Sequence, residues 1–101
     1  YRLSETLASR KHADPEKSYT AKLFADGPDS ILKKIGEECA ELIMAGKDGK
    51  RLPIVRESTD VIYHILVLLA FFDMGIEDVS QEMRRREGIS GIDEKASRGQ
   101  K

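Results

Sequence analysis

The chain has 101 residues, of which 40% are hydrophobic and 35% are charged, a composition typical of one globular domain rather than of a disordered segment. Its 17 basic residues nearly balance its 18 acidic residues, so the net charge is −1 and no overall field attracts nucleic acid or an acidic membrane. The single cysteine, Cys39, excludes an internal disulfide and any site built from paired cysteines.

No segment is apolar enough to predict a membrane span or a secretion signal. The longest apolar run, 65–72, has eight residues, whereas a membrane-spanning helix needs roughly 20. The first residues are polar and charged, unlike a signal peptide. We therefore expect a cytoplasmic protein that binds neither nucleic acid nor membranes.

Helical patterns recur along the chain, and alternating strand patterns are nearly absent. The first helix is predicted from Leu3 to about His12, with Ser4 as a candidate N-cap. A second, short helix is predicted after Ser18, which would cap it, and ends at Asp26-Gly27.

Two long helices and a shorter one are predicted next. Pro28 suits the first turn of a helix that reaches about Ala45, and the polar turn 46–50 ends it. The next helix is expected to start within 52–55 and to reach about residue 73, and the last covers 77–86. Residues 89–101 contain few apolar side chains, so we expect them to form a flexible tail of the single domain 1–101.

The helical period predicts which acidic side chains of the third helix are buried. One apolar stripe of this helix contains Ile31, Ile35, Cys39, Leu42 and Ile43. Glu38 lies at the edge of the stripe, so it should be partly buried. Glu41 should be intermediate, and Glu37 the most exposed.

The fourth predicted helix is apolar on almost every side from Val61 onward, a pattern typical of a helix buried all round. Four or five helices from one small chain are too few to enclose such a helix. We therefore predict an all-α fold of four to five helices in which two copies form a dimeric helical bundle.

Two acidic pairs share the same spacing, Glu38 with Glu41 and Glu57 with Asp60. Residues three apart lie on one face of a helix, and antiparallel helices would bring the two faces together. Converging carboxylates repel each other unless a cation lies between them, and an all-oxygen ligand set favours Mg²⁺ or Mn²⁺ over zinc. From spacing alone, an equal alternative is a solvated face whose acids pair with Lys33, Lys34 and Arg56.

These acids resemble a known signature. Glu37-Glu38-x-x-Glu41 followed by Glu57-x-x-Asp60 is similar to the EExxE…ExxD motif of the all-α, MazG-like nucleotide pyrophosphohydrolases. More specifically, the chain resembles the phosphoribosyl-ATP pyrophosphohydrolase family in three blocks that occur in order: SYTAKLFADGPDSILKKIGEECAEL, DVIYHILVLL and SGIDEKASR. The similarity covers roughly residues 3–98. Cys39 and Thr59 depart from the pattern, because small residues such as alanine are expected there.

The resemblance implies metal-dependent hydrolysis of phosphoribosyl-ATP to phosphoribosyl-AMP and pyrophosphate, the second step of histidine biosynthesis. The metal would be Mg²⁺, with Mn²⁺ as a substitute. By position, the resemblance implies four metal ligands: Glu38, Glu41, Glu57 and Asp60. It makes Glu37 and Glu38 the candidates for the catalytic carboxylates, Glu37 as a water-positioning group, and which carboxylate takes the proton stays open.

Several basic residues are candidates for binding the substrate's phosphates. Lys34 lies one turn before the acidic group, and Lys22 lies in the first of the three blocks that carry the resemblance. Arg85 is part of the basic run at the end of the last helix, and Lys95 and Arg98 lie in the tail. For Lys22 and the three C-terminal residues, an ordinary solvated charge is the alternative.

Two other functions remain open from the sequence. A house-cleaning nucleoside triphosphate pyrophosphohydrolase would use the same metal site on other nucleotides. A non-catalytic helical dimerisation module would carry the acids on its surface and would gain no thermal stability from Mg²⁺. His64 shares a side of its helix with Glu57 but lies two turns away, and we interpret it as a hydrogen-bonded core or interface residue rather than a ligand.

Overall fold

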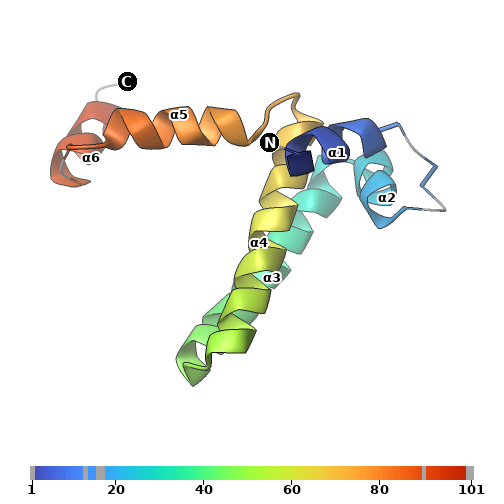
Figure 1. Cartoon of the computed structure of the whole chain (residues 1–101), viewed down its shortest axis with the longest axis horizontal. Helices are drawn as coiled ribbons and strands as arrows, with labels where there is room; N and C mark the ends of the chain where they lie inside the picture. The colour runs from blue at the N-terminus through green and yellow to red at the C-terminus, as the bar shows by residue number, and fades with distance from the viewer. Residues whose placement is uncertain (1, 13, 16–17, 90, 100–101) are drawn as a thin grey trace.

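The computed structural model describes residues 2–12, 14–15, 18–89 and 91–99, and within these ranges the chain is all-α, without strands. Its helices are α1 (Arg2–Arg10), α2 (Tyr19–Asp26), α3 (Pro28–Asp48), α4 (Arg51–Phe71), α5 (Ile76–Arg86) and α6 (Gly91–Gly99). Helices α3 and α4 form a long hairpin, α1 and α2 lie at one end of it, and α5 leads away from that end (Figure 1). The predicted all-α class is confirmed.

The ends of α2 and the start of α3 follow from their capping residues, as predicted. The Ser18 hydroxyl accepts a hydrogen bond from the Ala21 N–H at 3.2 Å. Gly27, with a φ of 94°, ends α2, and Pro28 begins α3. Because a single residue separates the two helices, the position of α2 against the start of α3 is set locally.

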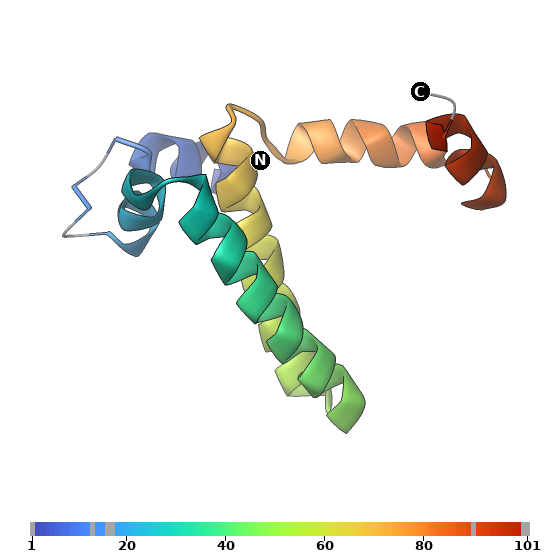
Figure 2. The same cartoon turned by 180° about the vertical axis from the view of Figure 1, so that it is seen from behind.

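The turn between α3 and α4 is shorter than predicted. Helix α3 continues through Gly46 to Asp48. It is capped by Gly49, whose φ of 70° is left-handed and whose N–H donates to the Ala45 carbonyl at 3.1 Å. Helix α4 then begins at Arg51 with Pro53 in its first turn, where its missing N–H costs nothing. The short connection returns α4 alongside α3 over the whole hairpin (Figure 2).

Ser4 does not cap α1, because α1 already begins at Arg2. Its hydroxyl instead accepts a hydrogen bond of 3.4 Å from the N–H of Ile76, the first residue of α5. The Asp78 carboxylate accepts a second one, of 3.0 Å, from the N–H of Gly75. The first bond joins the start of α5 to α1, whereas the second caps α5 within its own first turn. Helix α5 leaves α4 at an angle of 107°.

Helix α6 occupies a segment that was predicted to be a flexible tail. Its Ile92 side chain is 82% exposed, so burial does not explain this helix. Asp93 lies in the first turn and Arg98 in the last, an arrangement that suits the helix dipole. Together α5 and α6 form an arm whose far end lies away from the hairpin (Figure 1). Flexibility of the tail stays a prediction.

The apolar core lies at the end of the hairpin where α1 and α2 pack. It consists of Leu7, Leu23, Phe24, Ile31, Leu66, Val67 and Ala70. Beyond this core the hairpin is only two helices thick, and its remaining apolar residues have few partners in the same chain. Because the apolar core lies at one end of the hairpin, the contacts between α3 and α4 in its middle are not part of that core.

A seam of facing residues joins α3 to α4, and it contains two acids. On α3, Ile31 and Ala45 are buried, and Glu38 lies midway between them at the seven-residue spacing of packed helices. On α4, Glu57 occupies a partly buried position. Ile43, predicted to lie in the apolar stripe, is instead exposed because it falls outside this seven-residue repeat.

Within one chain, α4 is not buried on all sides, and its enclosure by a second copy stays a prediction. Helices α1 to α3 cover one side of it, whereas Ile62 on another side is 55% exposed, and Ile65 and Phe72 are also exposed.

In the described ranges no single helix is long and apolar enough to cross a membrane. Helices α4 and α5 meet that requirement only as a sharply bent pair.

Lys11 joins the loop after α1 to the end of α4. Its Nζ donates to the carbonyl oxygens of Ala70 and Phe71, at 3.1 Å each, and to Asp73 Oδ1 at 2.8 Å. The two carbonyls belong to the last turn of α4, where intrahelical partners run out. The hydrogen bond from Lys11 also lowers the pKa of Asp73.

We predict that Lys11→Met lowers the free energy of unfolding by about 1–2 kcal/mol, because the carbonyls at the end of α4 lose a charged donor. Urea unfolding followed by circular dichroism measures this change. Lys22→Met is the matched control, since Lys22 lies in an exposed ion pair with Asp26 at 3.2 Å, and it should cost less than about 0.5 kcal/mol. Equal losses in the two variants would contradict a specific role for Lys11.

Candidate metal centre

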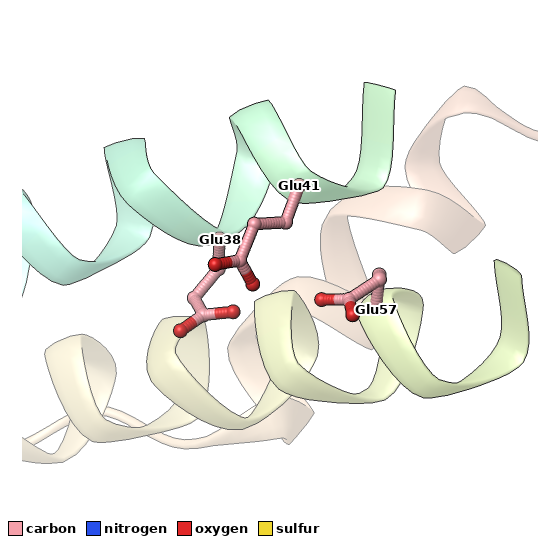
Figure 3. A group of neighbouring side chains, drawn as sticks. All are labelled: Glu38, Glu41 and Glu57. Carbon is pink, nitrogen blue, oxygen red and sulfur yellow. The ribbon is translucent and has the colours of Figure 1, made fainter. Parts of the chain in front are cut away.

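Three carboxylates converge in the middle of the hairpin. Glu38 and Glu41 extend from α3 and Glu57 extends from α4 toward them (Figure 3). One carboxylate oxygen from each residue lies within 4.8 Å of the other two. The three-residue spacing places the first two acids on one face of α3, and the antiparallel return of α4 places the third opposite them. The structure thus brings together three of the four predicted metal ligands.

The burial of these carboxylates fits a bound cation. Glu38 is 9% exposed and Glu57 is partly buried, whereas Glu41 is exposed. Within the described part of the chain, the buried Oε2 atoms of Glu38 and Glu57 have no hydrogen-bond donor. A buried, charged oxygen without a partner is strongly unfavourable. Because the available ligand atoms are all carboxylate oxygens, the site fits a hard divalent cation such as Mg²⁺ or Mn²⁺.

The other two predicted acids lie beside this group. Asp60, one turn after Glu57, is exposed, and its carboxylate is not part of the converging group among the described residues. Glu37 is exposed as predicted, and its Oε2 lies 3.5 Å from the Lys34 ammonium. The roles of Asp60 as a ligand and of Glu37 as a catalytic acid therefore stay predictions.

Lys34 places a positive charge next to the acidic group. Its Nζ lies 3.6 Å from Glu38 Oε1 as well as close to Glu37. The pKa of Lys34 is raised, chiefly by the nearby Tyr19 and also by Glu37 and Glu38. Among the predicted phosphate-binding residues, Lys34 is the one that the structure places at the carboxylates.

The remaining basic candidates lie elsewhere. Lys22 forms an exposed ion pair within α2. Arg85 donates to both carboxylate oxygens of Glu82, at 2.9 and 2.8 Å, on α5. Lys95 and Arg98 are exposed on α6 at the far end of the arm. Within one chain, therefore, the arm does not bring these residues to the carboxylates.

His64 is a buried, hydrogen-bonded residue of α4, as predicted. Its Nδ1 lies 2.7 Å from the Asp60 carbonyl oxygen, and its Nε2 lies 2.9 Å from the Tyr19 hydroxyl. With both nitrogens engaged, it is not available as a metal ligand. Tyr19 was missed from the sequence, because no spacing rule connects the first residue of a short helix to a histidine 45 residues later.

Comparison with known proteins identifies the family. Residues 1–87, which include α1 to α5 and all three carboxylates, match the sequence profile described as phosphoribosyl-ATP pyrophosphohydrolase. The chain is 87% identical over 101 residues to a phosphoribosyl-ATP pyrophosphatase of Dechloromonas aromatica, covering 100% of this chain and 94% of that protein. Phosphoribosyl-ATP pyrophosphatases of Nitrosospira multiformis and an Azoarcus species are 56% and 55% identical over 98 residues, covering 97% of this chain and 81% and 92% of theirs. The chain therefore belongs to the phosphoribosyl-ATP pyrophosphohydrolase family.

Proposed function

We propose that this protein hydrolyses phosphoribosyl-ATP to phosphoribosyl-AMP and pyrophosphate, the second step of histidine biosynthesis, with Mg²⁺ held by Glu38, Glu41 and Glu57. One observation carries the metal assignment: in a member of this family, three carboxylates converge, and two of them have buried oxygens without hydrogen-bond donors. Mn²⁺ would suit the same oxygen ligands. The substrate is a charged metabolite, so we place the reaction in the cytoplasm.

The reaction breaks a phosphoanhydride bond and forms a new bond between phosphorus and the oxygen of a water molecule. The water oxygen attacks the phosphorus next to the adenosine, the bond between this phosphorus and the bridging oxygen breaks, and pyrophosphate leaves with the electron pair. Bound Mg²⁺ would neutralise negative charge on the phosphate oxygens, and it would make a water molecule bound to it more acidic. Without such a cation, the carboxylates would repel the substrate.

The side chains then have distinct roles. Glu38, Glu41 and Glu57 hold the cation, and Asp60 is the proposed fourth ligand. Glu37, which is exposed beside them, positions the attacking water. The proton of that water passes to a carboxylate, for which Glu37 and Glu38 are the candidates. Lys34 offers the nearby positive charge to a phosphate oxygen.

A second copy of the chain is part of the proposal, because one copy leaves several large apolar side chains of α4 exposed. Leu52, Val55 and Ile62 lie on this helix at helical spacing, and each is about half exposed. Next to them is an apolar groove of about 370 Å³ lined by Leu3, Thr59, Ile62, Tyr63, Leu66 and Ile76. Soluble monomers rarely expose apolar surface of this extent. A homodimer in which the two α4 helices pack together would cover it.

The arm gives the dimer a further role in this proposal. Arg85, Lys95 and Arg98 do not reach the carboxylates of their own chain, because α5 leaves α4 at 107°. If they bind substrate phosphates, the site that they serve belongs to the other copy. The phosphate-binding role of these residues thus depends on the homodimer.

The direct test is a comparison of substrates. With Mg²⁺, the protein should release pyrophosphate from phosphoribosyl-ATP much faster than from a panel of nucleoside triphosphates at the same concentration. Turnover of the panel without turnover of phosphoribosyl-ATP would identify a house-cleaning enzyme instead. No turnover of either, together with no thermal stabilisation by Mg²⁺, would indicate a non-catalytic dimerisation module.

We predict that Glu57→Gln lowers kcat/KM by about 100-fold or more, because a lost metal removes several kcal/mol of transition-state stabilisation. Without metal, the variant should melt at a higher temperature than the wild type, since one member of a repelling group is gone, and Mg²⁺ should no longer raise its Tm. Glu5→Gln, exposed on α1, is the matched control and should change neither property. A Glu57→Gln protein that keeps both activity and stabilisation by Mg²⁺ would rule out this centre.

We also predict that the wild type sediments as a dimer at micromolar concentration. Ile62→Glu should shift it toward monomer or unfold it, because a charge would be buried between the two α4 helices. Ile92→Glu, at an exposed position on α6, should leave the dimer intact. A folded wild-type monomer in sedimentation velocity would contradict the proposed assembly.

A further inference from the structure

We propose that the arm of each copy packs, through α5, over the turn end of the other copy's hairpin, so that the two copies exchange arms. The turn end comprises residues 44–52, from the last turn of α3 to the first residues of α4. The inference rests on the homodimer proposed above. Helix α4, with 21 residues and a length of about 30 Å, separates the turn end of a chain from that chain's own arm (Figure 1). A contact between the two therefore requires a second copy.

Helix α5, the first part of the arm, has little packing within its own chain. It has 11 residues, none of them buried, and its Met83 side chain is 68% exposed. The hydrogen bond to Ser4 anchors only its first residue, Ile76. A helix of this length is marginally stable in water unless one of its faces packs against another element. A contact that one chain does not supply is thus expected to order α5.

The arm offers a groove for this contact at the corner where α5 leaves α4. The groove has a volume of about 330 Å³. Four apolar side chains from the two helices line it, together with three charged ones: Leu69, Met74, Val79, Met83, Asp78, Glu82 and Arg86. Arg86 is ion-paired with Glu82 at 3.0 Å, and the first turn of α5 contains two acids, Glu77 and Asp78, but no base. The groove therefore suits an apolar side chain with positive charges beside it.

The turn end presents the complementary chemistry. Its Met44 side chain is 62% exposed, and its Leu52 side chain is 56% exposed. Between them in the sequence stand three exposed basic residues and one exposed acid: Lys47, Lys50, Arg51 and Asp48. Exposed apolar side chains with a net positive charge beside them match the apolar, acidic groove of the arm.

Charge also selects how the two α4 helices run past each other. In a parallel pair the two turn ends would meet, and their like charges would repel. An antiparallel pair centred on Ile62, near the middle of α4, sets Leu52 opposite Phe72 of the other copy, since 52 and 72 are equally far from 62. Phe72 is 54% exposed and stands in the sequence between Leu69 and Met74 of the groove. Antiparallel packing thus brings each turn end to the groove of the other copy.

Arm exchange also brings the basic end of α5 within reach of the other copy's carboxylates. Glu57 lies six residues after Arg51, the first residue of α4, which is about 9 Å along the helix axis. Arg85 lies nine residues after the first residue of α5, or about 14 Å. An arm that starts at the turn end is therefore long enough to span the distance to the proposed metal site. The phosphate-binding role proposed for Arg85 in the other copy has a structural route through this contact.

The test is cross-linking of the wild type with a carbodiimide, which joins a lysine amine directly to a carboxylate that touches it. Chains labelled with heavy nitrogen and unlabelled chains are first unfolded and refolded together in equal amounts. Mass spectrometry should find peptides that join Lys47 or Lys50 to Glu77 or Asp78, including peptides with one labelled and one unlabelled partner. A dimer in which these lysines react only within their own chain, or not at all, would overturn arm exchange.

Removal of single charges gives an independent measurement. Asp78→Asn keeps the acceptor for the Gly75 N–H but removes a negative charge from the groove. It should raise the dissociation constant of the dimer, measured by sedimentation equilibrium at low salt, about two- to fivefold. With Lys50→Gln and Arg51→Gln already present, Asp78→Asn should have no further effect. Lys33→Gln, at an exposed position near the start of α3, is the matched control and should leave the constant unchanged.

The outcomes separate arm exchange from the homodimer and from the reaction. Additive effects of the groove and turn-end variants would overturn the exchange, because they would show that these charges do not meet. A wild type that sediments as a monomer would refute the homodimer and the exchange together, whereas a dimer without the cross-links would refute the exchange alone. None of these measurements uses the substrate, so a failure to hydrolyse phosphoribosyl-ATP would leave the exchange standing.

Discussion

The two helices of the hairpin pack through a seam in which carboxylates take places that apolar side chains would otherwise fill. Glu38 lies midway between the buried Ile31 and Ala45, and Glu57 approaches it from the other helix. Negative oxygens that lack donors in such a seam destabilise the packed helices unless a cation joins them. A cation bound here, as proposed, would stabilise the hairpin as well as serve the reaction. This single constraint links the stability of the fold to its activity.

The rest of the fold supports this seam. The left-handed turn at Gly49 sets the register that places Glu57 opposite Glu38 and Glu41. The apolar core lies at the other end of the hairpin, where α1 and α2 pack, so the carboxylates do not interrupt it. One surface of α4 remains apolar and open, and we assign it to a second copy. Different sides of the same two helices thus contribute to the apolar core, to the proposed metal site and to the proposed dimer interface.

Local features were predictable from the sequence, whereas features that depend on distant partners were not. Ser18, Gly27 and Pro28 act on their immediate neighbours, and the helix ends that they predict are confirmed. The burial of Glu38 followed from the helical period alone. By contrast, the choice between Gly46 and Gly49 as the end of α3 depends on which glycine takes the left-handed conformation, and both are equally plausible locally.

Long-range contacts explain the remaining differences. The role of Ser4 depends on where α5 docks, 72 residues later, and Tyr19 meets His64 across 45 residues. Neither pair has a sequence spacing that a helical period can predict. The family resemblance supplied the ligand set that spacing alone left open, and the structure brings three of those four acids together. For Asp60 the two differ, because the resemblance implies a metal ligand whereas its carboxylate is not part of the converging group among the described residues.

The most direct measurement is the location of the cation itself. Crystals of the wild type grown with Mn²⁺, measured at the manganese absorption edge, give an anomalous peak wherever the ion is ordered. We predict a peak between α3 and α4, at about 2.1 Å from oxygens of Glu38, Glu41 and Glu57. An ordered Mn²⁺ bound elsewhere, with these three carboxylates held only by protein side chains, would contradict it.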